Sequence, residues 1–251
     1  MQEWRLHHDP WRCPVIAPRE WLKRDPLQPG EQLFAVLGSA SDYCPVAAWR
    51  ESGEQPPEAI WAGTEYAQWE PVMPHAAVVA VDSAFLDWAA ECEGRDWGWL
   101  AVSTCPLPTV VAHLRSLTKV LMPDGQAVFF RFWDGTYLLP MLQAMGSEAK
   151  AMLPVFHRYW INGELHALAS SGAGPAKSSP WWAMSEAVLQ VLADHSSVTQ
   201  VENLLQWLEE ERPDLHGAFA AATLRHKVAY FVRMPHATPA ALVDYLALES
   251  G

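Results

Sequence analysis

The stretch WGWLAVSTCPLPTVVAHLRSLTKVL, Trp97–Leu121, decides the expected fold. Its first part, Trp97–Ser103, is an apolar run of strand length, and Pro106 and Pro108 suit the first turn of a helix. Apolar residues then recur at helical spacing as far as Leu121, which gives this helix one buried face. A strand followed at once by such a helix is typical of helices packed on a sheet.

The same alternation of short strands and helices extends over residues 30–168. Proline residues and polar clusters separate the apolar runs, as expected at the ends of elements. The predicted strands, besides Trp97–Ser103, are Leu33–Leu37, Ala76–Val81 and Ala127–Trp133. The predicted helices, besides the one ending near Leu121, are Pro18–Arg24, a helix from Asp82 or Ser83 to about Glu93, and Tyr137–Met145.

A β-hairpin is predicted at Asn162–Gly163, because Asn-Gly is the pair that a two-residue type I′ turn requires. With this turn as pivot, Ile161 pairs with Glu164 and His166 lies opposite Tyr159. The hairpin is expected at the edge of the sheet.

Composition divides the chain into four regions. We expect an irregular arm over residues 1–29, an α/β domain over 30–168, a Gly/Ser/Pro-rich linker over 169–180 and a helical lobe of about four helices over 181–251. The expected fold class is therefore an α/β lobe, a mixed sheet with flanking helices, followed by an all-α lobe.

The length, composition and net charge of the chain argue against several classes of protein. The chain has 251 residues, half of them hydrophobic, with 17 Lys plus Arg against 29 Asp plus Glu and a net charge of −12. Such an acidic chain repels nucleic acid, and no apolar run approaches the roughly 18 residues of a membrane span. The N-terminus lacks the apolar stretch of a signal peptide, so we expect a cytoplasmic protein. The 14 tryptophans favour a surface for recognition, since Trp is enriched at binding hot spots.

No catalytic or metal-binding motif stands out, and we expect no enzyme activity, metal or cofactor. Ser103, His113 and Asp134 form a weak candidate for a hydrolytic triad. His7 and His8, beside Asp9, form a weak candidate metal site, and so do His157 and His166. Arg131 lies inside an apolar run, so its guanidinium needs a partner, for which Asp134 or Asp124 is suitable.

Three segments together resemble a known family: LFAVLGSAS (33–41), IWAGTEYAQWEPVMPHAAVVAV (60–81) and the stretch from Trp97 to Leu142. Their order resembles the bacterial domain of unknown function found in adaptor chaperones of type VI secretion, often called Tap or Tec proteins. The resemblance covers roughly residues 30–165. Gly135 and Thr136 depart from the family pattern, which usually has proline and often arginine after the aspartate. The matching residues are Trp97, Gly98, Ser103, His113, Leu114, Arg115, Asp124, Gly125, Arg131, Phe132 and Asp134.

The resemblance implies a cytoplasmic adaptor that binds a cognate secreted effector and loads it onto the VgrG or PAAR spike protein. Two alternatives stay open, a hydrolase with the triad above and a carbohydrate-binding protein that uses exposed tryptophans. The expected partner-binding residues are Trp97, Arg115, Arg131, Trp133, Asp134, Trp181 and Trp182.

Overall fold

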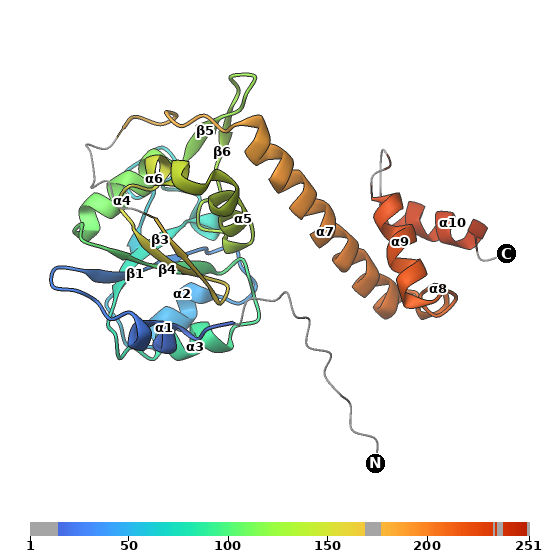
Figure 1. Cartoon of the computed structure of the whole chain (residues 1–251), viewed down its shortest axis with the longest axis horizontal. Coiled ribbons are helices and arrows are strands. Elements are labelled where there is room, and N and C mark those ends of the chain that lie inside the picture. The colour runs from blue at the N-terminus through green and yellow to red at the C-terminus, as the bar shows by residue number, and fades with distance from the viewer. Residues whose placement is uncertain (1–14, 169–176, 233, 235–237, 250–251) are drawn as a thin grey trace, which may run out of the picture. The chain divides into compact units, whose positions relative to one another are not determined.

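A computed structural model describes residues 15–168, 177–232, 234 and 238–249; for 195–199 and 249 it describes the backbone alone. The chain divides into two compact units, Met1–Ser185 and Glu186–Gly251 (Figure 1). The first unit holds the strands and the second holds helices. The expected class, an α/β lobe and a helical lobe, is confirmed.

The first unit is built on a six-stranded sheet whose order is β2-β3-β1-β4-β7-β8. Every pairing in this sheet is antiparallel, which corrects the expectation of a mixed sheet. The reason is that β1 lies between β3 and β4 and runs opposite to both, so these two parallel strands are never neighbours. The strands are β1 Gln32–Leu37, β2 Glu58–Ala59, β3 His75–Val79, β4 Gly98–Ser103, β7 Arg158–Ile161 and β8 Glu164–Ala167.

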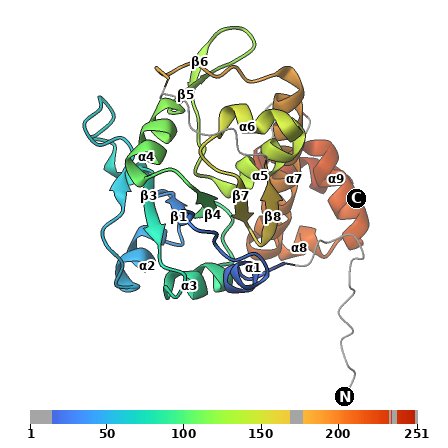
Figure 2. The same ribbon diagram turned by 60° about the vertical axis from the view of Figure 1, so that its left-hand side comes forward.

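Helices cover both faces of this sheet, with α1, α2 and α3 on one side and α4, α5 and α6 on the other (Figures 1 and 2). Between its first and last residues each of the two central strands, β1 and β4, is therefore apolar on both faces. Leu33 and Ala35 join the core with Trp21 and Phe85, while the ring of Phe34 meets Phe156 on the other face. The helices are α1 Pro18–Arg24, α2 Pro45–Glu51, α3 Phe85–Glu91, α4 Leu107–Ser116, α5 Gly135–Met145 and α6 Ala149–Met152, with short 3₁₀ turns at Glu70–Val72 and Gly146–Glu148.

Two predicted elements are wrong between α4 and α5. The helix stops at Ser116 instead of continuing to Leu121, and Lys119–Leu121 is strand β5. The predicted strand Ala127–Trp133 is shortened to β6, Ala127–Phe129, which pairs with β5 in a separate two-stranded sheet. Hydroxyl groups explain the early end of the helix, because Ser116 and Thr118 donate to carbonyls three residues back. The Asp-Gly turn then folds β6 onto β5 at once.

The second hairpin agrees with its prediction. Ile161 pairs with Glu164 and Tyr159 with His166, and β8 is an edge strand of the main sheet. Asn162 and Gly163 have φ angles of 53° and 82°, as a type I′ turn requires.

The second unit begins at Glu186, and residues 181–185 belong to the first unit. Trp182 O accepts from Leu121 N–H at 2.8 Å, and Met184 N–H donates to Leu121 O at 2.8 Å, so this segment runs along the edge of β5. The predicted linker over 169–180 lies largely outside the described residues. The helices are α7 Glu186–Glu211, α8 Pro213–His216, α9 Ala221–Phe231 and α10 Pro239–Glu249.

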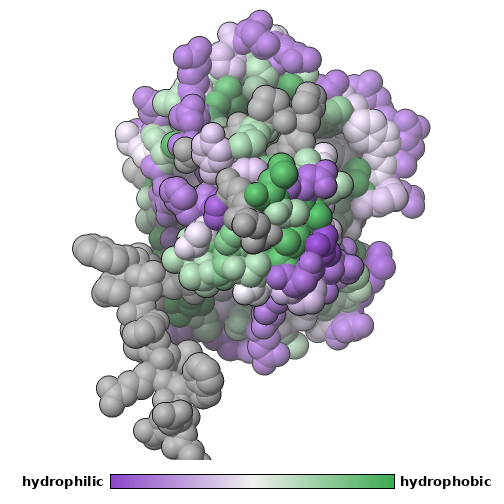
Figure 3. All heavy atoms as spheres, turned by 90° about the vertical axis from the view of Figure 1, so that its right-hand side faces the viewer, coloured by the Kyte–Doolittle hydropathy of each residue, from purple (hydrophilic) through white to green (hydrophobic). Residues whose placement is uncertain are grey.

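The helical unit has its own apolar core, in which Leu208, Val228, Leu242 and Leu246 are buried. Thr238 Oγ1 accepts from Ala241 N–H at 3.3 Å and so caps the first turn of α10. Figure 3 shows the face of the molecule that lies to the right in Figure 1. On this face hydrophobic residues, in green, are gathered beside hydrophilic ones, in purple. Across the described part of the chain, no helix combines the length and the apolar character that a bilayer crossing demands.

Gly98 sets how closely β4 approaches β1. Its φ is +146°, and a Cβ added there would lie 2.0 Å from Val36 O. We expect Gly98→Ala to lower the free energy of unfolding by about 3 kcal/mol or more, measured by urea denaturation. Gly53→Ala is the control, because its φ is +77° but no atom lies within 4 Å of the added Cβ. That change should cost about 1 kcal/mol, from backbone strain alone, and equal losses in the two variants would contradict the close approach.

Candidate partner-binding surface

The first half of the candidate surface is a group of aromatic rings around Trp61. The Trp61 side chain is buried, at 2% exposed, while Trp69 and Phe129 are 38% and 41% exposed. Ring centroids lie 6.2 Å apart for Trp61 and Trp69, and 5.0 Å apart for Trp69 and Phe129. Tyr66 completes the group, with its ring 5.1 Å from that of Phe129. We call Tyr66, Trp69 and Phe129 the aromatic patch.

Local turns in the segment after β2 bring the patch together. Thr64 Oγ1 donates to Trp61 O at 2.7 Å, and Trp69 N–H donates to Tyr66 O at 3.0 Å. These turns fold residues 61–69 back on themselves, so the three aromatic rings of this segment meet. Phe129 comes from β6, far along the chain, and the indole of Trp61 lies beneath it.

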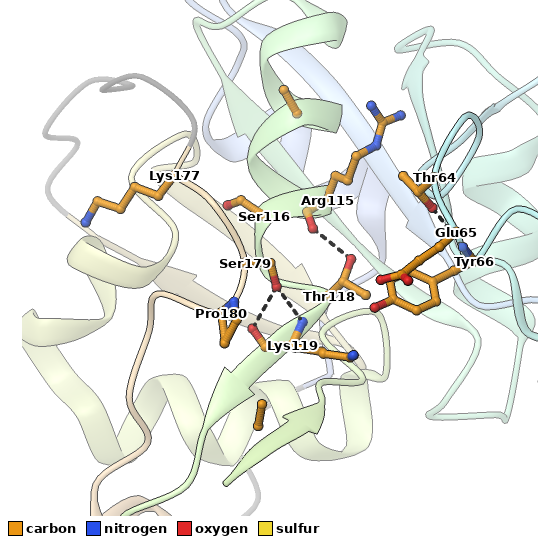
Figure 4. Close-up of a pocket in the computed structure, with 12 residues that line it drawn as sticks. Thr64, Glu65, Tyr66, Arg115, Ser116, Thr118, Lys119, Lys177, Ser179 and Pro180 are labelled. Atoms are coloured by element: carbon orange, nitrogen blue, oxygen red, sulfur yellow. Dashed lines mark hydrogen bonds between the residues drawn. The ribbon is translucent and has the colours of Figure 1, made fainter. Parts of the chain in front are cut away.

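The second half of the surface is a groove of about 530 Å³ next to the patch. Its charged lining side chains are Arg115 from α4, Lys119 from β5, Lys177, and one carboxylate, Glu65. Figure 4 shows Lys119 directed toward Glu65 and Tyr66, whereas the side chain of Lys177, which also lines the groove, extends away from Lys119. We call this the basic groove.

Lys119 joins the two halves. Its Nζ lies 5.3 Å from the ring centroid of Tyr66 and 5.1 Å from that of Phe129, within the range of cation–π attraction. The nearby Tyr66 side chain, followed by the Glu65 charge, raises the pKa of Lys119. The ammonium therefore stays charged at neutral pH at the border of the aromatic patch.

Most hydroxyl groups in the basic groove hold the fold together. Thr118 Oγ1 accepts from Trp61 Nε1–H at 3.0 Å and donates to Arg115 O at 2.7 Å. Ser179 Oγ accepts from Lys119 N–H at 3.1 Å (Figure 4). Arg115 differs, because its Nε donates to Ile60 O at 2.6 Å while its two Nη groups have no partner among the described residues. Half of a positioned guanidinium thus stays available at the groove.

Three of the expected partner-binding residues either line the basic groove or follow its lining residue Pro180 in the sequence. Arg115 lines the groove, and Trp181 Nε1–H donates to Ser116 Oγ at 3.0 Å. The Trp181 ring also supports Lys177, whose Nζ lies 4.0 Å from the ring centroid. Trp182 stacks on Phe130, with centroids 6.0 Å apart.

The other expected residues lie elsewhere. Trp97 is buried against Phe85 and Trp88, so its side chain has no surface for a partner. Trp133 is also buried, with its ring 5.5 Å from that of Trp61. For these two tryptophans a role in direct contact is corrected to a role in the core, since neither side chain is accessible.

Arg131 and Asp134 form the ion pair that the sequence suggested. Arg131 Nη2 lies 3.0 Å from Asp134 Oδ2, and the arginine side chain is 53% exposed whereas the aspartate is 2% exposed. Asp134 Oδ1 also accepts from Thr136 N–H at 2.9 Å and so caps α5. Burial raises the pKa of Asp134, although the charge of Arg131 and the Thr136 hydrogen bonds oppose this shift.

The candidate triad is not assembled. Ser103 Oγ donates to Val155 O at 2.5 Å, and His113 Nε2 lies 2.8 Å from Met152 O. Both side chains therefore anchor the segment between α6 and β7. Asp134 meanwhile caps α5, and burial lowers the pKa of His113. Ser103, His113 and Asp134 all lie in the described part of the chain, and no hydrogen bond joins any two of their side chains.

The candidate metal ligands are not gathered either. His157 Nε2 pairs with Glu31 Oε1 at 2.7 Å, while His166 lies against the ring of Tyr159. Within the described ranges, no three His, Cys, Asp or Glu side chains are grouped to hold a metal ion. His7, His8 and Asp9 lie outside those ranges.

Sequence reasoning missed the aromatic patch and two cations of the basic groove. Trp61, Tyr66 and Trp69 are spaced five and three residues apart in a segment without regular structure. That spacing, in a chain already rich in tryptophan, was the available signal. Phe129 and Lys119 could not be connected to it without knowing that β5 and β6 pair beside this segment.

The Arg131–Asp134 pair has a measurable consequence. We expect Arg131→Ala to lower the free energy of unfolding by about 1 kcal/mol at neutral pH, because a buried carboxylate loses a partner that water already screens in part. Arginine stabilises only the ionised carboxyl, so the loss should shrink as pH falls through the raised pKa of Asp134. Urea denaturation at several pH values measures this, with exposed Arg95→Ala as the control. A loss independent of pH would show that the ion pair is not its cause.

Comparison with known proteins gives one match. Residues 33–151 match the model of a family described as a domain of unknown function, DUF4123. No curated protein matches the chain, and no solved structure matches it. The matched region runs from β1 into α6 and includes the whole aromatic patch together with Arg115 and Lys119 of the basic groove. The chain therefore carries, in just under half of its length, a region similar to DUF4123.

Proposed function

We propose that this chain is a cytoplasmic adaptor that binds a secreted effector of a type VI secretion system and delivers it to the VgrG or PAAR spike protein. The observation that carries the proposal is the aromatic patch, in which the exposed rings of Trp69 and Phe129 and the half-buried ring of Tyr66 lie beside a groove lined by cations. Such a surface is suited to holding another polypeptide.

The aromatic patch has the chemistry of an interface hot spot. Trp, Tyr and Arg are the residues that most often dominate binding energy between proteins, and all three occur here in Trp69, Tyr66 and Arg115. The rings are held in place from below by Trp61, so little side-chain freedom is lost when a partner covers them.

The ordered motifs support the identity of the partner. The segments that resemble the type VI adaptor family span roughly residues 30–165, which overlaps the region 33–151 matched to DUF4123. Most of the aromatic patch and the basic groove lies inside both ranges. We therefore expect the same surface to serve the adaptor function.

Co-purification tests the proposal directly. The tagged chain is co-expressed with the product of a neighbouring effector gene and, in a separate experiment, with a spike protein encoded nearby. We expect a stable complex with at least one of them. Failure to bind any neighbouring effector or spike protein would remove the basis of the adaptor function.

The aromatic patch should be required for that complex. We expect Trp69→Ala combined with Phe129→Ala to weaken effector binding at least about tenfold, because two hot-spot rings are lost. Titration calorimetry measures the affinity, and thermal melting checks the fold, which should change little since both rings are partly exposed.

Tyr43→Ala is the matched control for this experiment. Tyr43 is an aromatic residue of the same unit, 46% exposed, and it lies near Gly94 rather than in the aromatic patch. It should bind the effector normally. An equal loss in the control, or full binding by the double variant, would place the interface elsewhere.

A second function has a specific observation in its favour. Exposed Trp69 and Phe129 rings resemble the apolar platforms on which carbohydrate-binding proteins stack sugars. Soluble glycans would then quench tryptophan fluorescence in the unaltered chain and not in Trp69→Ala. Absence of quenching across a panel of glycans would leave the adaptor function as the better explanation.

A further inference from the structure

We infer that the basic groove binds an acidic segment of the partner polypeptide, while an apolar side chain of the same segment rests on the aromatic patch. This inference rests on the proposed function, because it gives the chemistry of the segment that the adaptor would hold. Three features of the surface carry it: its charge, the open donors of Arg115, and the continuity between the groove and the patch.

The charge of the basic groove is opposite to that of the chain. Overall, 29 acidic residues outweigh 17 basic ones, yet the groove is lined by Arg115, Lys119 and Lys177 against Glu65 alone. The net charge of the chain repels an acidic segment, whereas the cations of the groove attract it. Such complementarity guides a partner to one place and fixes its orientation.

Arg115 has donors ready for a carboxylate. Its Nε–H is used by Ile60 O at 2.6 Å, which holds the guanidinium plane, and its Nη groups have no partner among the described residues. A guanidinium presents a planar fork that matches the two oxygens of a carboxylate. The half-buried position of Arg115 strengthens this pairing, because less water competes for the donors.

The groove and the patch form one continuous surface through the β5–β6 hairpin. Lys119 lies opposite Phe129, and Ala127, two residues before Phe129, lines the groove. Alternate residues of a strand share a face, so Lys119, Ala127 and Phe129 project on the same side of the hairpin. A segment leaving the groove therefore meets the Lys119 ammonium and then the exposed rings of Phe129 and Trp69.

The size of the groove fits a short segment. About 530 Å³ is within the range of sites that enclose a small ligand, roughly 300–1,000 Å³. A few side chains of an acidic peptide can enter it, whereas a folded domain cannot. Nucleic acid is less suited, since three cations in a chain of net charge −12 cannot neutralise many phosphates.

Peptide binding to the full chain tests the inference. The probes are fluorescein-labelled decapeptides of alternating Glu and Leu, alternating Ser and Leu, and alternating Lys and Leu, measured by fluorescence anisotropy at low and physiological salt. We expect saturable binding of the Glu-Leu peptide, weakened by salt, and weaker binding of the Ser-Leu peptide. For the Lys-Leu peptide we expect only the weaker, non-saturable binding that the net charge of −12 causes at low salt.

A pair of matched variants assigns the binding to the groove. Lys119→Gln with Lys177→Gln should weaken binding of the Glu-Leu peptide on the order of tenfold at low salt and reduce its salt dependence. Lys23→Gln with Lys150→Gln removes the same charge from exposed lysines that do not line the groove. This control should change binding less than about twofold, since such distant charges are screened.

Several results would overturn the inference: no saturable binding of the Glu-Leu peptide, equal affinity for the Lys-Leu peptide, or equal losses in the two double variants. Binding of an oligothymidylate that is equally sensitive to Lys119→Gln and Lys177→Gln would identify a nucleic-acid site instead. If the effector binds normally to the Lys119→Gln, Lys177→Gln variant, the inference of an acidic segment in the groove is wrong, while the proposed adaptor function is not affected. If the Glu-Leu peptide binds as expected but no effector or spike protein does, the adaptor function is contradicted. The groove is then a binding site for acidic peptides with another role.

Discussion

The indole of Trp61 is the constraint on which the candidate surface depends. It is buried, so its N–H must be paired, and Thr118 Oγ1 accepts it at 3.0 Å. This one bond ties the segment after β2 to the residue that precedes β5. The rings of Trp69 and Phe129 lie against the buried Trp61 ring and are partly exposed. The aromatic patch is thus supported by a buried tryptophan.

A short chain of hydrogen bonds connects that constraint to the charged half of the surface. Thr118 Oγ1 donates to Arg115 O at 2.7 Å, and Arg115 Nε–H donates to Ile60 O at 2.6 Å, the residue next to Trp61. The path therefore closes on itself. Because the members of such a network support one another, disturbing Thr118 would displace the arginine and the rings together. The same hydrogen bonds therefore position both the aromatic patch and the basic groove.

Local signals were sufficient for much of the fold and for little of the surface. The helix at Pro18–Arg24, the strand before Gly38 and the Asn162–Gly163 hairpin follow from propensity, turn chemistry and period, which act over a few residues. The end of α4 was missed because the helical spacing of apolar residues continues to Leu121. The helix nevertheless ends earlier, where the hydroxyl groups of Ser116 and Thr118 bind carbonyl oxygens three residues back. The Arg131–Asp134 pair was foreseeable, since the partners are three residues apart. Composition alone could not say that Trp97 is buried and Trp69 exposed, because that depends on contacts between distant segments.

The partial exposure of the surface also bears on how an adaptor would release its cargo. Trp69 and Phe129 already have more than half of their area covered, so a partner removes only the remainder from water. Pairs formed with Lys119 and Lys177 lie at an open rim, where water and salt weaken them. A contact of this kind gains its specificity from the order of charge and apolar groups, and its affinity stays moderate. Moderate affinity is what transfer to a second protein requires, since a contact that removed more apolar area from water would hold the cargo too tightly to pass it to the spike.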